Sequence, residues 1–379
     1  MGKNASRLGI RKMPGKSFKL YSLGFILIPF FWGVNFLPTN DDVLILKAEK
    51  LPFTPTEYFI AGIVDERKDQ SAVAWLVPAA GTKLVKQDLK GGGLAGIRQF
   101  IKQSMPSNEK LRPIVIRLKE CRITEIPGTQ QRVDGIVNIE MGFYLQRNGE
   151  EIHLLDYKGG AKYGRTVNQQ YVAEAVLRQS LGNALNYLNT WMNKEVATNE
   201  KLAKGIKVIF AEPNTANRRD TVFYNSTKPL TWSDFKAKPN SKSIFAASVF
   251  PGFGYKGHSE VKDGIVYLTL NMEVFVVQQA SWVKEIARNA YALNHEQRHF
   301  DIVKLVAENF KKRVQPDSLT VADYNSIIQY KYIESFREMN RLQEQYDGET
   351  RHGIDKEAQA RWNKKIDAEL FKAGVKNNR

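Results

Sequence analysis

The sequence contains one cysteine and five histidines in 379 residues. The lone thiol, Cys121, excludes an intramolecular disulfide framework and any structural zinc site built from cysteines, so a bound metal would need histidine and carboxylate ligands. Only one apolar run approaches the thickness of a bilayer, which excludes a multi-spanning membrane protein. Cys121 lies in a strand-like run without a neighbouring histidine, and we expect an unreactive buried thiol.

The chain is long and apolar enough to form two globular units. Its hydrophobic content of 42% can fill a core, and this excludes a mostly disordered chain. The sequence has 56 Lys and Arg against 40 Asp and Glu, a net charge of +16. Neither a zinc finger nor a basic and aromatic platform accompanies this charge, so we expect no nucleic-acid partner.

Residues 1–38 have the pattern of an export signal. Six basic residues and no acidic residue precede an apolar stretch at residues 20–37, and such a flank directs export. No small-residue cleavage site follows closely, so a cleaved signal peptide and a signal anchor attached to the membrane are both open. We expect the body of the chain in the periplasm, in the cell envelope or outside the cell. The alternative is a buried N-terminal helix of a cytoplasmic protein.

Residues 39–195 are expected to form an α+β accessory domain with a mixed sheet and helices. Several segments alternate in the manner of strands, and Asn148-Gly149 predicts a tight hairpin turn between strands at 136–146 and 151–157. A helix is expected from Gly96 to about Pro106, and a longer one over about 168–193, where apolar residues form a stripe. The polar stretch at 196–227 predicts a linker.

Residues 228–379 are expected to form the second domain, a small sheet followed by three helices. The first helix is expected from a cap at Ser281 to about Arg313, and the second from Thr320 toward Tyr346. The third begins near Asp355 and ends at Gly374. The fold class of the whole chain is therefore predicted as α+β.

The first of these helices contains the motif HExxH, from His295 to His299. Two histidines four residues apart lie one turn above the other on a helix, so both imidazoles can bind one zinc ion. Glu296 is rotated by about 100° from His295, which lets it reach a zinc-bound water without binding the ion. Zinc lowers the pKa of that water to about 7, and the carboxylate can then act as general base.

A catalytic zinc site needs a third protein ligand. Asp301 points to another side of the helix and is expected to be a packing or outer residue. The segment from Tyr346 to Gly353 is expected to be a glycine-containing turn between two helices, and its His352 is the first choice of ligand. Glu349 is the second choice, because a carboxylate is an equally sound zinc ligand, and Asp347 is the third.

These segments resemble a known family. LTWSDF, SWV, LNHEQRHFDI and YDGETRHG, followed by Gln359 and Trp362-Asn363, are similar to the bacterial predicted secreted zinc-dependent proteases, long described as a domain of unknown function. The resemblance covers roughly residues 229–370. It implies a zincin-like metallopeptidase domain and an exported protein.

Motif and resemblance together predict an exported zinc metallopeptidase that acts on peptides or proteins. His295, His299 and His352 would bind Zn²⁺, and Glu296 would act as base and then acid. Tyr346 or Arg351 would donate a hydrogen bond to the oxyanion of the transition state. The alternative is a non-catalytic envelope protein with a structural or vestigial zinc site and a binding N-terminal domain.

Overall fold

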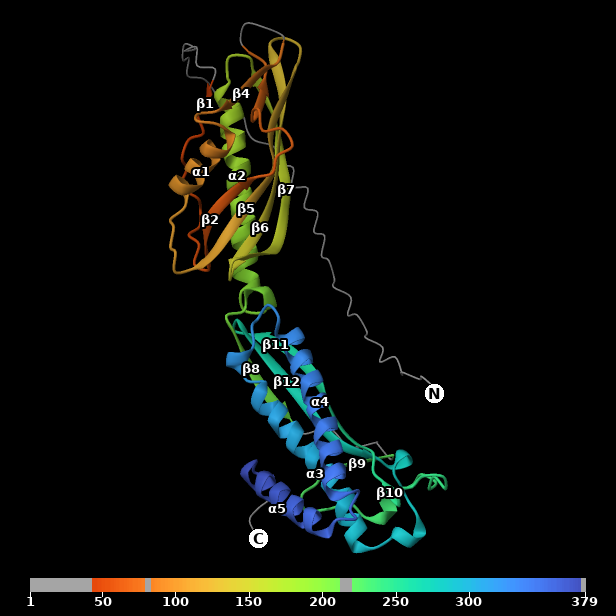
Figure 1. Cartoon of the computed structure of the whole chain (residues 1–379). Helices are drawn as coiled ribbons and strands as arrows, with labels where there is room; N and C mark the ends of the chain where they lie inside the picture. Colours follow the sequence, from red (N-terminus) through yellow and green to blue (C-terminus); the bar gives the residue numbers. More distant parts are fainter. Residues whose placement is uncertain (1–42, 79–82, 212–219, 376–379) are drawn as a thin grey trace. The chain divides into compact units, whose positions relative to one another are not determined.

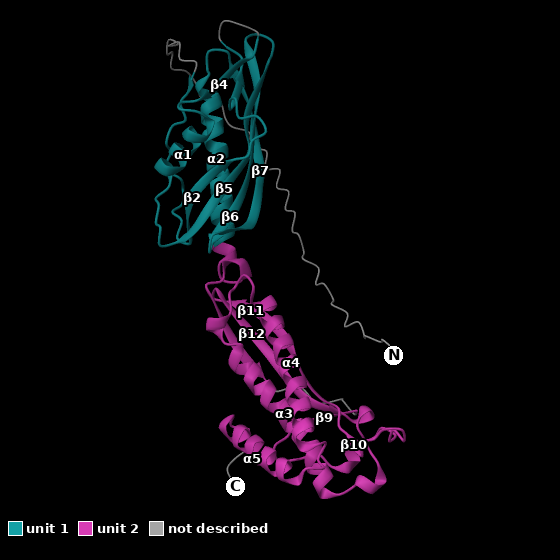
Figure 2. Cartoon of the chain, in the orientation of Figure 1, with its two compact units in different colours: residues 1–192 teal, residues 193–379 magenta. Residues whose placement is uncertain are grey.

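The computed structural model describes residues 43–78, 83–211 and 220–375. The chain divides into two compact units, residues 1–192 and 193–379 (Figure 2). Both units combine sheets with helices, which confirms the α+β fold class. The expected export segment at residues 1–38 lies outside the described residues. Within the part of the chain that is described, no helix combines the length and the apolar character needed to cross a membrane.

The described part of the first unit is built on a seven-stranded sheet with the order β1-β4-β3-β5-β6-β7, in which β2 also pairs with β5. Figure 1 shows the long strands β5, β6 and β7 of this sheet. Its strands are β1 (Val43–Leu44), β2 (Tyr58–Asp65), β3 (Ala74–Leu76), β4 (Val85–Leu89), β5 (Arg112–Pro127), β6 (Arg132–Arg147) and β7 (Glu150–Thr166). Two helices accompany the sheet, α1 (Gly93–Ser104) and α2 (Tyr171–Glu195). Tyr187 of α2 contacts Tyr157 of β7, with the ring centroids 5.4 Å apart, so α2 packs on the sheet.

The hairpin expected at Asn148-Gly149 joins β6 to β7. Arg147 pairs with Glu150, and both turn residues have positive φ angles, 53° at Asn148 and 84° at Gly149. These angles suit an asparagine and a glycine, which is why this dipeptide predicts the turn correctly. Most of the expected stripe on α2 is also confirmed, because Val176, Leu181, Leu185, Leu188 and Met192 are all buried, whereas Val172 is half-buried.

In its described residues, 193–211 and 220–375, the second unit has a four-stranded sheet, a two-stranded sheet and three long helices. Its strands are β8 (Gly205–Ala211), β9 (Thr221–Phe223), β10 (Ala247–Ser248), β11 (Pro251–Lys262), β12 (Ile265–Val277) and β13 (Trp282–Val283). Its α-helices are α3 (Ala290–Arg313), α4 (Tyr324–Thr350) and α5 (Lys356–Lys372), and short 3-10 helices occur at Glu200–Leu202, Trp232–Asp234, Gln278–Ala280, Glu285–Ala287 and Pro316–Ser318. In the larger sheet β12 pairs with β11, β8 and β9, and β10 pairs with β13 in the smaller one. A hydrophobic core joins the larger, four-stranded sheet to α3 and α4.

The described residues of the segment 196–227, which was predicted as a linker, belong to the second unit. β8 pairs in parallel with β12 from Gly205 to Ala211, and β9 pairs with the far end of the same strand. Ile206, Val208 and Phe210 pack against the core of this unit. The linker prediction was wrong because the polar residues flanking these short strands outweighed the apolar alternation within β8.

The first long helix of this unit does not start at Ser281, which corrects the sequence prediction. The Ser281 hydroxyl donates to the Val277 carbonyl and accepts from the Phe250 N–H, both at 2.9 Å. It therefore fixes a turn before β13. The helix α3 begins at Ala290, after Asn289, whose side chain caps the first turn.

The second long helix extends further than expected. The turn predicted from Tyr346 onward is still helical, because α4 continues through Gly348 to Thr350 and ends where Arg351 adopts a left-handed conformation. The third helix begins as predicted, with the Asp355 side chain accepting from the Ala358 N–H at 2.9 Å. The longer α4 changes which side chains of this segment can face α3.

Candidate metal centre

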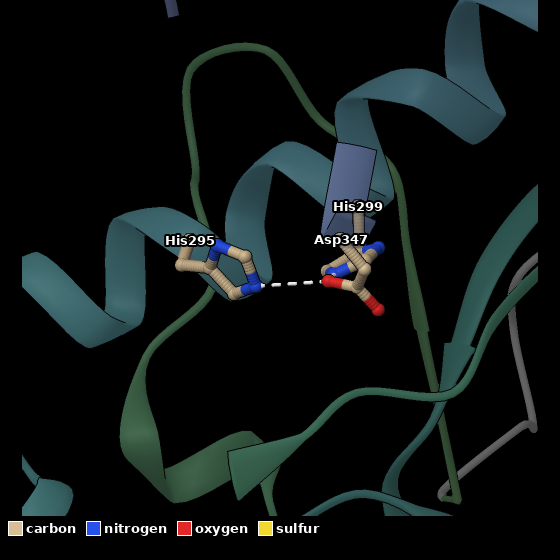
Figure 3. Close-up of side chains that lie close together, drawn as sticks. All are labelled: His295, His299 and Asp347. Atoms are coloured by element: carbon tan, nitrogen blue, oxygen red, sulfur yellow. Dashed lines mark hydrogen bonds and ion pairs between the residues drawn. The ribbon is translucent and has the colours of Figure 1, made fainter. Parts of the chain in front are cut away.

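The two histidines of the HExxH motif and Asp347 converge on one point (Figure 3). The Nε2 atoms of His295 and His299 lie 3.2 and 3.0 Å from the Oδ1 atom of Asp347. Both histidines are 7% exposed. Each residue offers one ligand atom, and these three atoms lie within 4.8 Å of one another. Two elements, α3 and α4, thus form the centre.

Tyr346 holds both imidazoles in place. Its ring stacks on His295 with the centroids 4.8 Å apart, and it meets His299 edge-on at 4.9 Å. Tyr346 is fully buried, and the Trp362 ring of α5 also meets it edge-on, with the centroids 5.4 Å apart. The side chain before Asp347 therefore packs between residues of α3 and α5 at the centre.

Two glutamines set the orientation of the histidine rings. The Nδ1 atom of His295 lies 2.8 Å from the amide oxygen of Gln359, and the Nδ1 atom of His299 lies 2.5 Å from that of Gln343. An amide oxygen can only accept, so both Nδ1 atoms donate. Each Nε2 atom is thereby directed toward Asp347, the arrangement in which outer partners fix metal-binding histidines.

The charges at the centre are matched. Burial alone would raise the pKa of Asp347, but hydrogen bonds from His295 and His299 hold it well below its usual range. Burial alone would lower the pKa of His299, but the Asp347 carboxylate raises it above the ordinary value. The two effects favour an ionised Asp347 carboxylate paired with a protonated His299 imidazole.

The donor set fits zinc. In a tetrahedral site with bonds of about 2.0–2.2 Å, neighbouring ligand atoms stand roughly 3.3–3.6 Å apart. The two distances from Asp347 to the histidines, 3.2 and 3.0 Å, are only slightly shorter. Two imidazoles and one carboxylate also match the number of protein ligands in catalytic zinc sites, which keep the fourth position open.

Glu296 lies beside this group and is held by the backbone of another segment. Its Oε2 atom accepts a hydrogen bond from the Val249 N–H at 2.9 Å, just after β10. The side chain is buried, and this burial raises its pKa, against the lowering effect of His299 and His295. One carboxylate oxygen is thus occupied by the backbone. The role of Val249 could not be found from the sequence, because a backbone donor leaves no mark on residue type.

The structure does not bring His352 and Glu349, the first two choices for the third ligand, into the group. The His352 side chain is half exposed, with its Nδ1 atom 3.5 Å from the Oδ2 atom of Asp347. The carboxylate of Glu349 accepts from Trp362 Nε1 and Gln345 Nε2, both at 2.7 Å. Because α4 continues past Gly348, Glu349 is turned by about 200° from Asp347 around the helix.

The remaining predicted residues lie around the centre. Asp301 is fully buried, and its carboxylate accepts from the Tyr224 hydroxyl at 2.9 Å and from Arg298 at 3.0 Å. The hydroxyl of Tyr346 lies in the interior and accepts from Gln359 Nε2 at 2.5 Å. A buried hydroxyl with this partner is placed for packing rather than for contact with a substrate. Arg351 is exposed at the end of α4.

A polar network extends from the centre into α5. Gln359 donates to the side-chain oxygen of Asn363 at 2.8 Å, and Arg298 donates to the same atom at 3.1 Å. Arg298 also binds the carboxylate of Asp367 through two nitrogens, at 2.6 and 2.9 Å. This network ties the histidine-orienting Gln359 to both α3 and α5, so the ring of His295 is fixed by tertiary structure.

No protein-family model and no curated protein matches the sequence. Among solved structures, the chain is similar to a protein from Xanthomonas campestris assigned to the family DUF330. The identity is 8%, the match covers 40% of this chain and 92% of the other, and the TM-score is 0.27. A TM-score this low supports no inference about this chain.

Proposed function

We propose that this chain is a zinc-dependent metallopeptidase of the zincin type, with His295, His299 and Asp347 as its metal ligands. One observation carries the proposal: two imidazole Nε2 atoms and a carboxylate oxygen converge beside a buried Glu296. The pattern HExxH implies the two histidines and the glutamate. The geometry favours Asp347 over His352 as the third ligand, because Oδ1 of Asp347 faces both histidines.

Zinc in this site would polarise a scissile carbonyl and lower the pKa of a bound water to about 7. Glu296 would accept the proton of the attacking water and pass it to the leaving amine. The Val249 N–H holds one oxygen of this carboxylate, which leaves the other for the proton.

Metal analysis and peptide hydrolysis together test the proposal. The purified chain should contain one zinc ion per molecule and should cleave an unstructured protein such as casein, and a chelator should abolish cleavage reversibly. Zinc bound at full stoichiometry without any turnover would favour the alternative, a non-catalytic envelope protein. Absence of stoichiometric metal would contradict the peptidase and a structural zinc site alike, and would leave only a vestigial site.

We also propose that the body of the chain is exported, on the basis of the basic flank and apolar stretch within residues 1–38. A reporter that is active only in the cytoplasm, fused after Asn40, should be silent. A strong signal from this fusion would contradict export.

A further inference from the structure

Exposed apolar side chains lie close to the proposed metal centre. We define the apolar rim as five residues of the second unit with 40–93% of their surface exposed: Ile244, Phe245, Phe250, Ile286 and Ile354. Ile244 and Ile286 are 92% and 93% exposed, and Phe250 is 60% exposed. Large apolar side chains that gather on a protein surface mark a binding site more often than chance.

The segment 244–250 connects the rim to the chemistry of the site. At one end the Val249 N–H donates to Glu296 at 2.9 Å. At the other end the Phe245 ring lies 4.6 Å from the His352 ring, whose Nδ1 atom is 3.5 Å from the Oδ2 atom of Asp347. This segment therefore passes from the proposed general base to the proposed third ligand.

Two further contacts place the other rim residues beside this segment. The backbone N–H of Lys284 donates to the Ala246 carbonyl at 2.8 Å, and the ammonium group of Lys284 donates to the Ser243 carbonyl at 2.6 Å. Ile286 follows two residues after Lys284. Ile354 follows two residues after His352, the residue that Phe245 touches. Ile286 and Ile354 thus belong to the two segments that contact residues 243–246.

We infer that the apolar rim binds a large apolar side chain of the peptide substrate, next to the bond that is cleaved. The inference depends on the proposed function and names its substrate class. Phe250 directly follows Val249, the backbone partner of Glu296. Phe245 contacts His352, which lies beside Asp347. These two rim residues therefore lie within reach of a side chain that flanks a scissile bond. Burial of a leucine or phenylalanine side chain there should favour such peptides by about tenfold to a hundredfold over peptides with serine at the same position.

Binding to an inactive variant tests the inference separately from catalysis. Blocked hexapeptides with leucine or serine at the central positions are titrated into zinc-loaded Glu296→Gln protein. Leucine peptides should bind about tenfold more tightly or better. Ile286→Ser in the same background should reduce this preference severalfold, and so should Phe245→Ser. Ile333→Ser is the matched control, because Ile333 is a 49% exposed residue of α4, about 21 Å along the helix from Asp347.

Each outcome has a definite meaning. Cleavage of peptides by the wild-type protein without a leucine preference would overturn the inference and leave the proposed function intact. A leucine preference in binding that both rim variants reduce would support apolar recognition. If the wild-type protein then cleaved nothing, that result would count against the proposed function alone. Loss of binding to anionic phospholipid vesicles in the rim variants, with unchanged peptide binding, would identify a membrane surface and overturn the inference.

Discussion

Replacement of Asp347 by asparagine should weaken zinc binding by about a hundredfold or more. The substitution keeps the shape of the side chain and removes its negative charge. The Oδ1 atom that faces both histidines, at 3.2 and 3.0 Å, becomes part of a neutral amide. Because His295, His299 and their glutamine partners are unchanged, the loss measures the contribution of the carboxylate.

The magnitude follows from the number of ligands. Zinc sites with four protein ligands bind the ion with about 10–16 kcal/mol, or roughly 3 kcal/mol for each ligand. A loss of 3 kcal/mol corresponds to about a hundredfold in affinity. The pKa of Asp347 is held well below its usual range, so the wild-type carboxylate is already ionised at neutral pH and no proton has to leave it.

Competition with a chromogenic chelator measures the effect. Glu349→Gln is the matched control, since it neutralises a carboxylate two residues later on the same helix, whose partners are Trp362 and Gln345. This control should bind zinc as the wild type does. If Asp347→Asn retains wild-type affinity while His352→Ala loses it, the assignment of Asp347 is refuted and a three-histidine site is restored.

Three other substitutions give separate tests. Glu296→Gln should keep its zinc and lose peptide hydrolysis by at least about a hundredfold, and wild-type turnover would exclude Glu296 as the base. Gly353→Ala should weaken zinc binding by roughly tenfold, because φ at Gly353 is +80° and a Cβ would lie 3.2 Å from Nδ1 of His295. An unchanged zinc affinity in chelator competition would contradict this prediction. Gly160→Ala should lower the melting temperature of the first unit by about 4–8 °C, since a Cβ would lie 1.8 Å from the Val137 carbonyl oxygen. An unaltered calorimetric transition would show that β6 and β7 can separate at no cost.

The sequence was sufficient for features that depend on local spacing. The four-residue interval between His295 and His299 places both on one face of a helix whatever surrounds it. The Asn148-Gly149 turn and the helix start near Asp355 follow in the same way from backbone preferences of a few residues. The stripe on α2 follows from helical periodicity. These features were predicted correctly because the interactions that produce them lie within one or two turns of the chain.

Only the tertiary structure decided which side chain faces the two histidines. Gly348 and the polar residues around it indicated a turn, yet packing of Tyr346 against His295 and Trp362 keeps this segment helical. The helical phase then directs Asp347 toward α3 and Glu349 toward α5. The partner of Glu296, the Val249 N–H, also comes from a distant segment. Contacts between residues some fifty positions apart leave no periodic pattern in the sequence, because they depend on how helices and strands pack in space.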